Sequence, residues 1–162
     1  MSPPRAEFDL AIRSRIGIDA PADAVWAHLS RLQAWKSSVV SLERLSGQPD
    51  AEGETLRVGQ RPGDVTVNMI MRTVRVQRPG WKIQTLQTED GDATNGYVVY
   101  TLDAEGEGTR LSCDVVARCR VPLPPGVTDV AAFAQQANAS TLAKLDADHA
   151  ALKALVESGR PC

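Results

Sequence analysis

The stretch of residues 128–158 constrains the fold most, because it is the only long segment with sustained helical periodicity. At about 100° per residue its apolar and small side chains share one stripe, while residues such as Lys144 lie on the opposite face. Thr128 or Asp129 can cap the start of this helix, and Gly159 can end it. A helix of this length extends on the order of 45 Å, so we expect it to lie across the rest of the domain.

The stripe carries unusually small and polar side chains for a buried helix face. A helix buried only for stability would present Leu, Ile or Phe there. The stripe instead consists of Val130, Ala134, Ala137, Asn138, Thr141, Leu142, Leu145, Asp148, His149, Leu152, Leu155 and Val156. Short side chains leave room, so the pattern predicts a cavity between this helix and the surface that it covers.

Length and composition are typical of one soluble domain. The chain has 162 residues, and 18 Lys and Arg against 20 Asp and Glu give a net charge of −2 without a basic block, so we expect no nucleic-acid partner. No apolar run approaches about 18 residues and no signal-peptide pattern is present, which predicts no membrane span and a cytoplasmic location. Cys113 and Cys119 would lie about 20 Å apart on one strand, so we expect reduced thiols.

Before residue 128 the chain shows the two-residue period of strands, interrupted once by helical spacing. A strand over 8–18 precedes two short helices, one ending at about Leu32 and one over 33–36. Further strands are expected at 39–45, 55–60, 65–77, 81–88, 94–102 and 109–121. The breaks between them are short and rich in Gly and Pro, which permits hairpins and no parallel crossover. An antiparallel meander follows.

The expected strand over 65–77 changes phase in its middle. Apolar residues occupy odd positions through Met71, and then Val74 and Val76 take even positions. A β-bulge near Arg72 and Thr73 would reconcile the two halves. The alternative is a strand covered on both faces, for example at a dimer contact.

One segment of the chain is similar to a known family signature. Residues 18–29 read I-D-A-P-A-D-A-V-W-A-H-L, and Leu32, Trp35 and the strand at 39–43 follow them. This order resembles the opening of the START-like, or SRPBCC, superfamily, and most of all its polyketide cyclase/dehydrase and lipid-transport branch. The turn at 108–111, with the sequence G-T-R-L, is similar to that branch as well. The order of elements matches from about residue 8 to 156, within a single domain over 1–162.

The resemblance implies an α+β helix-grip fold. A curved antiparallel sheet of about seven strands, with two short helices after the first strand, would wrap around the long C-terminal helix. Such folds hold a deep, largely apolar cavity between sheet and helix, in agreement with the small side chains of the stripe. Ligands of the superfamily are lipids, sterols, polyketides and other hydrophobic or aromatic small molecules.

Three residues are candidates for chemistry inside such a cavity. Tyr100, on the same strand face as Val98, could donate a hydrogen bond to a carbonyl or enolate oxygen, or it could be a core tyrosine bonded to backbone or water. Arg72 could bind a carboxylate if it points inward, or lie on the solvent face. His149, beside Asp148, could act as an acid or base near neutral pH or serve as a hydrogen-bonded packing residue.

The remaining ligand-binding candidates come from expected inward faces. They are Trp35, Met69, Met71, Trp81, Val98, Cys113, Val115, Ala134, Asn138 and Thr141. For Asn138 and Thr141 the alternative is to fill a polar gap, and for the methionines plain packing. His28 and His149 lack a second pair of ligands at metal-binding spacing, so we expect no metal and no cofactor.

Three functions are compatible with these residues. The first is a binding or carrier protein for a hydrophobic small molecule. The second is a cofactor-free polyketide cyclase, aromatase or dehydratase, in which Tyr100, Arg72 and His149 would handle protons and oxyanions. The third is a protein-interaction module whose groove accepts a polypeptide segment. A homodimer is compatible with each of them.

Overall fold

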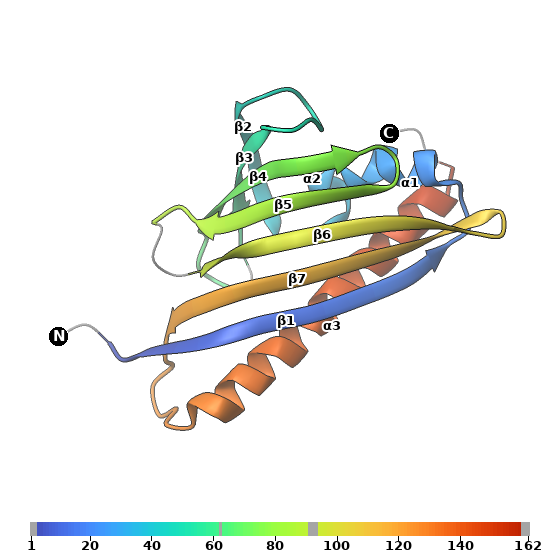
Figure 1. Ribbon diagram of the computed structural model, residues 1–162. Helices are drawn as coiled ribbons and strands as arrows, with labels where there is room; N and C mark the ends of the chain where they lie inside the picture. Colours follow the sequence, from blue (N-terminus) through green and yellow to red (C-terminus); the bar gives the residue numbers. More distant parts are fainter. Residues whose placement is uncertain (1–2, 62, 91–93, 160–162) are drawn as a thin grey trace.

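A seven-stranded antiparallel sheet in the order β1-β7-β6-β5-β4-β3-β2 forms the body of the computed structural model (Figure 1). The structure describes residues 3–61, 63–90 and 94–159, so the breaks expected between the strands at 55–60 and 65–77 and between those at 81–88 and 94–102 lie partly outside it. The strands are β1 (Arg5–Ile18), β2 (Val39–Ser46), β3 (Thr55–Gln60), β4 (Val67–Gln77), β5 (Trp81–Thr88), β6 (Thr94–Glu105) and β7 (Gly108–Pro122). Strands β2 to β7 form the predicted meander, and β1 extends it by pairing with β7.

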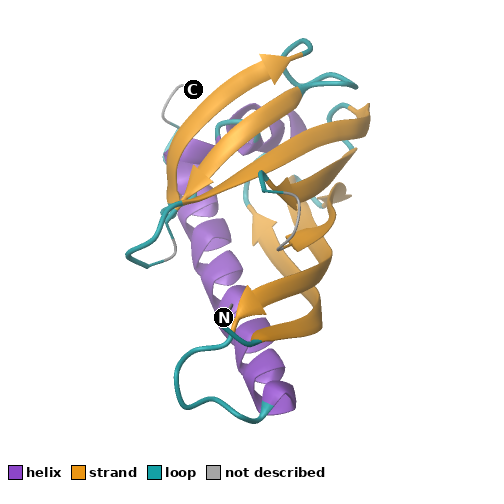
Figure 2. Cartoon of the chain, turned by 90° about the vertical axis from the view of Figure 1, so that its left-hand side faces the viewer, coloured by secondary structure: helices purple, strands orange, loops and turns teal. Residues whose placement is uncertain are grey.

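Three helices accompany the sheet: α1 (Ala22–Leu29) and α2 (Leu32–Trp35) between β1 and β2, and α3 (Val130–Glu157) after β7. The Asp129 side chain caps α3 by accepting a hydrogen bond from the Ala132 N–H at 2.9 Å. Figure 2 shows the strands bending over α3, which confirms the predicted helix-grip arrangement. No helix in the described ranges is long and apolar enough to cross a membrane.

Helix α3 is attached to the sheet along the backbone of its edge strand β1. The Asn138 Oδ1 accepts a hydrogen bond from the Ala11 N–H at 3.0 Å, and its Nδ2 donates to the Asp9 carbonyl at 3.2 Å. Farther along the helix, Lys153 Nζ donates to the Gly17 carbonyl at 2.8 Å. These side chains satisfy backbone groups that an edge strand otherwise leaves open.

The two halves of α3 are buried to different extents. All of its buried residues lie at or after Leu145. Leu152 is fully buried and belongs to one apolar cluster with Ile18, Leu29 and Leu111. The first half of the helix, by contrast, remains largely exposed. The solid core therefore covers one end of the helix, near α1 and α2.

The predicted β-bulge is present in β4. The pairing of β4 with β5 shifts register between Thr73 and Arg75. Met71 and Thr73 are buried before the shift, whereas Val74 is exposed. The bulge therefore lies slightly later than expected, and Val74 does not join the inner face.

Candidate functional site

A cavity of about 290 Å³ lies between the inner face of the sheet and the middle of α3. Its walls come from six strands, from α2 and the residue after it, and from α3. The lining residues are Leu10, Ile12, Leu32, Lys36, Gln60, Met69, Met71, Leu86, Thr94, Val98, Tyr100, Cys113, Val115, Ala117, Thr141, Lys144, Leu145 and Asp148. Most of them are apolar, so the cavity suits a largely hydrophobic ligand.

Short side chains on facing walls create this hollow. Strand β7 contributes Cys113, Val115 and Ala117, which alternate on the inner face as the strand period requires. The helix contributes Thr141, whose hydroxyl donates to the Ala137 carbonyl at 2.7 Å and is thereby satisfied within α3. Since none of these side chains can reach across, the sheet and the helix leave space between them.

A fixed ion pair forms the polar edge of the cavity. Lys144 Nζ donates to Asp148 Oδ2 at 3.2 Å and to the Ser38 hydroxyl at 2.7 Å. The other carboxylate oxygen of Asp148 accepts from the Ser37 backbone N–H at 3.3 Å and from its hydroxyl at 3.2 Å. Asp148 is therefore satisfied at both oxygens and joins α3 to the segment after α2.

Lys36 is the second ammonium group in the cavity wall. Its Nζ lies 5.5 Å from the centre of the Trp35 ring, and within the described chain it makes no hydrogen bond or ion pair. Burial lowers the pKa of Lys36, the Asp148 carboxylate opposes that change, and the nearby Lys144 charge adds to it. The cavity thus contains a cationic group without a bonded partner.

Tyr100 and Cys113 form a neutral polar pair in the wall. Tyr100 is 2% exposed and hydrogen-bonds to the Cys113 thiol. Burial raises the pKa of the phenol well above its usual value and raises the pKa of the thiol to about 12. Both groups stay protonated near neutral pH, so Tyr100 can donate a hydrogen bond but is no base.

His149 is completely buried behind the cavity wall and does not line it. The Ser14 hydroxyl donates to Asp146 Oδ1 at 2.5 Å, so its oxygen accepts from His149 Nδ1–H at 2.9 Å. The ring lies 5.8 Å from that of Trp35. Burial and the Lys36 charge lower the pKa of His149 to about 4, although Asp146 and Asp148 oppose this. The imidazole is therefore neutral at physiological pH and acts in packing.

The cavity brings together many of the candidate residues, namely Met69, Met71, Val98, Tyr100, Cys113, Val115 and Thr141. The other candidates lie elsewhere. Trp35 packs on His149, and Trp81 donates to the Gln77 side chain at 3.1 Å. Ala134 does not line the cavity, and Asn138 binds the β1 backbone instead.

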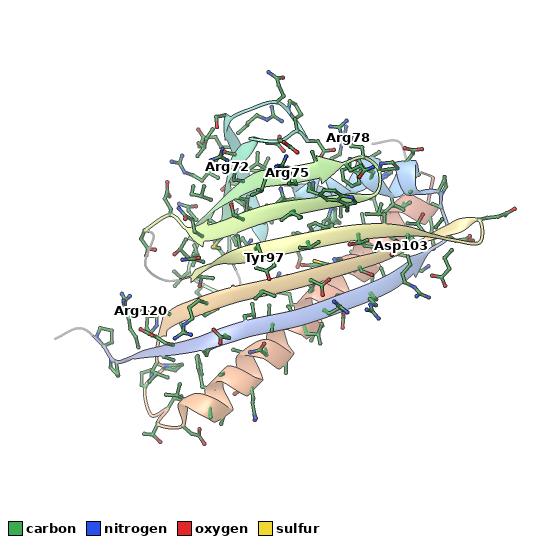
Figure 3. The ribbon with its side chains drawn as sticks, in the orientation of Figure 1. Arg72, Arg75, Arg78, Tyr97, Asp103 and Arg120 are labelled. Atoms are coloured by element: carbon green, nitrogen blue, oxygen red, sulfur yellow. The ribbon has the colours of Figure 1, made fainter. Side chains whose placement is uncertain are left out.

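Arg72 lies on the outer, solvent-exposed face of the sheet, turned away from α3 (Figure 3). The structure therefore corrects the inward alternative for this residue. It also corrects the solvent position expected for Lys144, which lines the cavity. An i,i+4 spacing places Lys144 only about 40° from Asp148 around the helix, and its long stem covers that distance.

Lys36 is a cavity residue that was not among the predicted site residues. The available signal was its position directly after Trp35, at the end of the short helix that faces the sheet. Among the residues that the structure describes, no three His, Cys, Asp or Glu side chains gather as a metal site would require.

Comparison with protein families gives a decisive match. The family model described as polyketide cyclase/dehydrase and lipid transport matches residues 9–157. The chain belongs to this family. A search of curated proteins finds no significant match.

Several solved structures of other proteins share the fold. A START superfamily protein from Mycobacterium smegmatis has a TM-score of 0.71 at 17% identity, with 91% of this chain and 97% of that one covered. The Zhui aromatase/cyclase from Streptomyces sp. R1128 has a TM-score of 0.70 at 13% identity, covering 93% and 94%. A conserved protein from Geobacillus kaustophilus reaches 0.71 at 17% identity, covering 92% and 96%. At these identities the likeness establishes the fold.

Proposed function

We propose that the protein binds a hydrophobic or aromatic small molecule, lipid-like or polyketide-like, in the cavity between the sheet and α3. The observation that carries this proposal is a mostly apolar lining around about 290 Å³. That volume lies just below the range of about 300–1,000 Å³ for ligand pockets, so it favours a compact ligand. Met69 and Met71 supply flexible walls that can adapt to different shapes.

Native mass spectrometry of the purified protein, followed by extraction of any bound molecule, tests this proposal directly. A paired substitution on β7 tests the location. Val115→Phe should fill part of the cavity and reduce binding of an apolar fluorescent probe by about tenfold or more. Val116→Phe adds the same ring on the outer face, where Val116 is exposed, and should leave binding unchanged.

Equal effects of the two Phe substitutions would place the ligand outside the cavity. Failure to recover a molecule, together with no thermal shift from fatty acids, sterols and aromatic polyketides, would contradict small-molecule binding altogether.

A second candidate function is a cofactor-free cyclase or aromatase. Tyr100 supports it, because a protonated phenol in an apolar wall can stabilise an enolate oxygen as it develops during an aldol-type ring closure. The similarity of the fold to an aromatase/cyclase is compatible with it. Arg72 and His149 take no part, since neither lines the cavity.

Turnover of a poly-β-ketone substrate distinguishes the two functions. Tyr100→Phe should abolish most ring closure while the substrate still binds. Tyr97→Phe is the matched control, because Tyr97 is exposed on the outer face of the same strand. Absence of turnover in the unmodified protein, with binding intact, would favour the carrier function.

A further inference from the structure

The charged groups of the cavity wall are not balanced. Among the described lining residues the charged side chains are Lys36, Lys144 and Asp148. Lys144 and Asp148 neutralise each other through their ion pair at 3.2 Å. Lys36 remains without a bonded counter-charge, so the wall carries one excess positive charge.

We propose that the ligand of this cavity is an amphipathic carboxylic acid, whose carboxylate binds the ammonium group of Lys36 while its apolar body fills the space beside β7. This proposal rests on the proposed function, because it assumes that the cavity holds a small molecule. It adds the chemical class of that molecule and the residue that recognises it.

Lys36 is half-buried, and within the described chain its ammonium group has no hydrogen-bonded or ion-paired partner. Partial burial removes part of the hydration of this ammonium group, and an opposite charge with hydrogen-bonding oxygens compensates that loss. Asp148 does so only in part, because its carboxylate attracts the Lys36 charge but forms no hydrogen bond to Lys36 and is already paired with Lys144. A ligand carboxylate supplies the missing charge and forms charge-assisted hydrogen bonds.

The neighbouring groups suit a carboxylate as well. Trp35 presents a ring face on one side of the ammonium group. Tyr100 lines the same cavity and remains a hydrogen-bond donor near neutral pH. The lining contains no carboxylate among the described residues except that of Asp148, so repulsion of an anionic ligand is confined to an ion pair that is already neutral.

Paired probes test the proposal on the full chain. We would measure binding of 2-naphthylacetate and of its uncharged amide by calorimetry at neutral pH. The two molecules have nearly the same shape, so their difference reports the charge. We expect the acid to bind at least about tenfold tighter than the amide.

Two substitutions then assign the effect to Lys36. Lys36→Met keeps the length and the apolar stem, and should remove the preference for the acid while leaving affinity for the amide within about twofold. Lys153→Met removes the same charge outside the cavity, where Lys153 contacts Gly17 and Glu157, and should keep the preference. If the Met variant does not fold, Lys36→Gln provides the same comparison.

The outcomes separate the two proposals. Tight but equal binding of acid and amide would overturn the role of Lys36 and leave the cavity as a binding site. An unchanged preference in Lys36→Met, or its loss in Lys153→Met, would also overturn it. Binding of neither probe, with no other hydrophobic ligand recovered, would contradict the proposed function itself.

Discussion

The two halves of α3 face the same sheet but serve different purposes. The half that includes Leu152 belongs to one buried apolar cluster with residues of α1 and β7, such as Leu29 and Leu111. The region from Thr141 to Asp148 instead borders about 290 Å³ of space. One helix thus provides both dense packing and room for a ligand, at positions only about one to three turns apart. Stability and binding should therefore respond to different substitutions.

The largest expected effect is on the free energy of unfolding, and it is tested by replacing Leu with Ala at two positions of α3. Leu152→Ala should lower the free energy of unfolding by about 2–5 kcal/mol, because the residue is enclosed on all sides. Leu145→Ala should cost clearly less, because Leu145 already borders the cavity and has fewer contacts to lose. Urea denaturation of both variants measures the difference, and equal losses would contradict the contrast.

The stability of the fold should depend on pH through His149, which lies on α3 between the cavity and the buried Leu152. Its pKa is about 4 in the folded protein and about 6.5 when unfolded, so the unfolded chain binds the extra proton between these values. Stability is thus retained above pH 6.5 and lost as pH falls toward 4, by about 2 kcal/mol between pH 7 and pH 5 for this group.

The matched variant for that measurement is His149→Asn, which keeps an N–H donor for Ser14 but cannot titrate. Its free energy of unfolding should fall less than that of the unmodified protein over the same pH interval. Parallel curves for the two proteins would show that His149 does not contribute the pH dependence.

A smaller effect is expected at the exposed half of α3. Asn138→Ala removes the hydrogen bonds to Ala11 and Asp9, and should lower the free energy of unfolding by about 1 kcal/mol. Gln135→Ala, on the exposed side of the same turn, should have almost no effect. A comparable loss in both variants would indicate helix propensity rather than attachment to β1.

The smallest expected effect concerns the charge of the cavity wall and its influence on the affinity for an anionic ligand. Asp148→Asn removes the only lining carboxylate of the described chain, so Lys144 adds its charge to that of Lys36. Affinity for 2-naphthylacetate should rise by about threefold, with affinity for its amide unchanged. Asp103→Asn, on the distant part of β6, is the control (Figure 3). A fall in affinity for the acid would contradict this account.

Most of the fold could be predicted because local patterns and global packing agree. The two-residue period marked strands such as β7, and Asp129 marked the start of α3. The break in phase along β4 correctly indicated a bulge, but it did not decide that Val74 would be the residue expelled to the surface. A bulge can be placed one residue earlier or later without changing the sequence pattern around it.

The site was predicted less completely, because its position depends on distances that periodicity does not contain. The small-residue stripe correctly predicted a hollow, yet Asn138 lies beyond it and bonds to β1. Lys36 and Lys144 were missed because long side chains reach the cavity from backbone positions outside its wall. The face of the sheet on which Arg72 lies depends on the position of the bulge, so the sequence alone could not decide whether its side chain points inward or outward.

The attachment of α3 to β1 also bears on when binding can begin. Ala11 and Asn138 are 127 positions apart along the chain, so their contact closes a very long loop. Closing such a loop costs conformational entropy before the contact stabilises the chain, so contacts of this kind tend to form late in folding. A partly folded chain that contains only the strands from β2 to β6 lacks β1, β7 and α3, which supply much of the cavity wall. Ligand uptake should therefore report completed assembly of the whole domain.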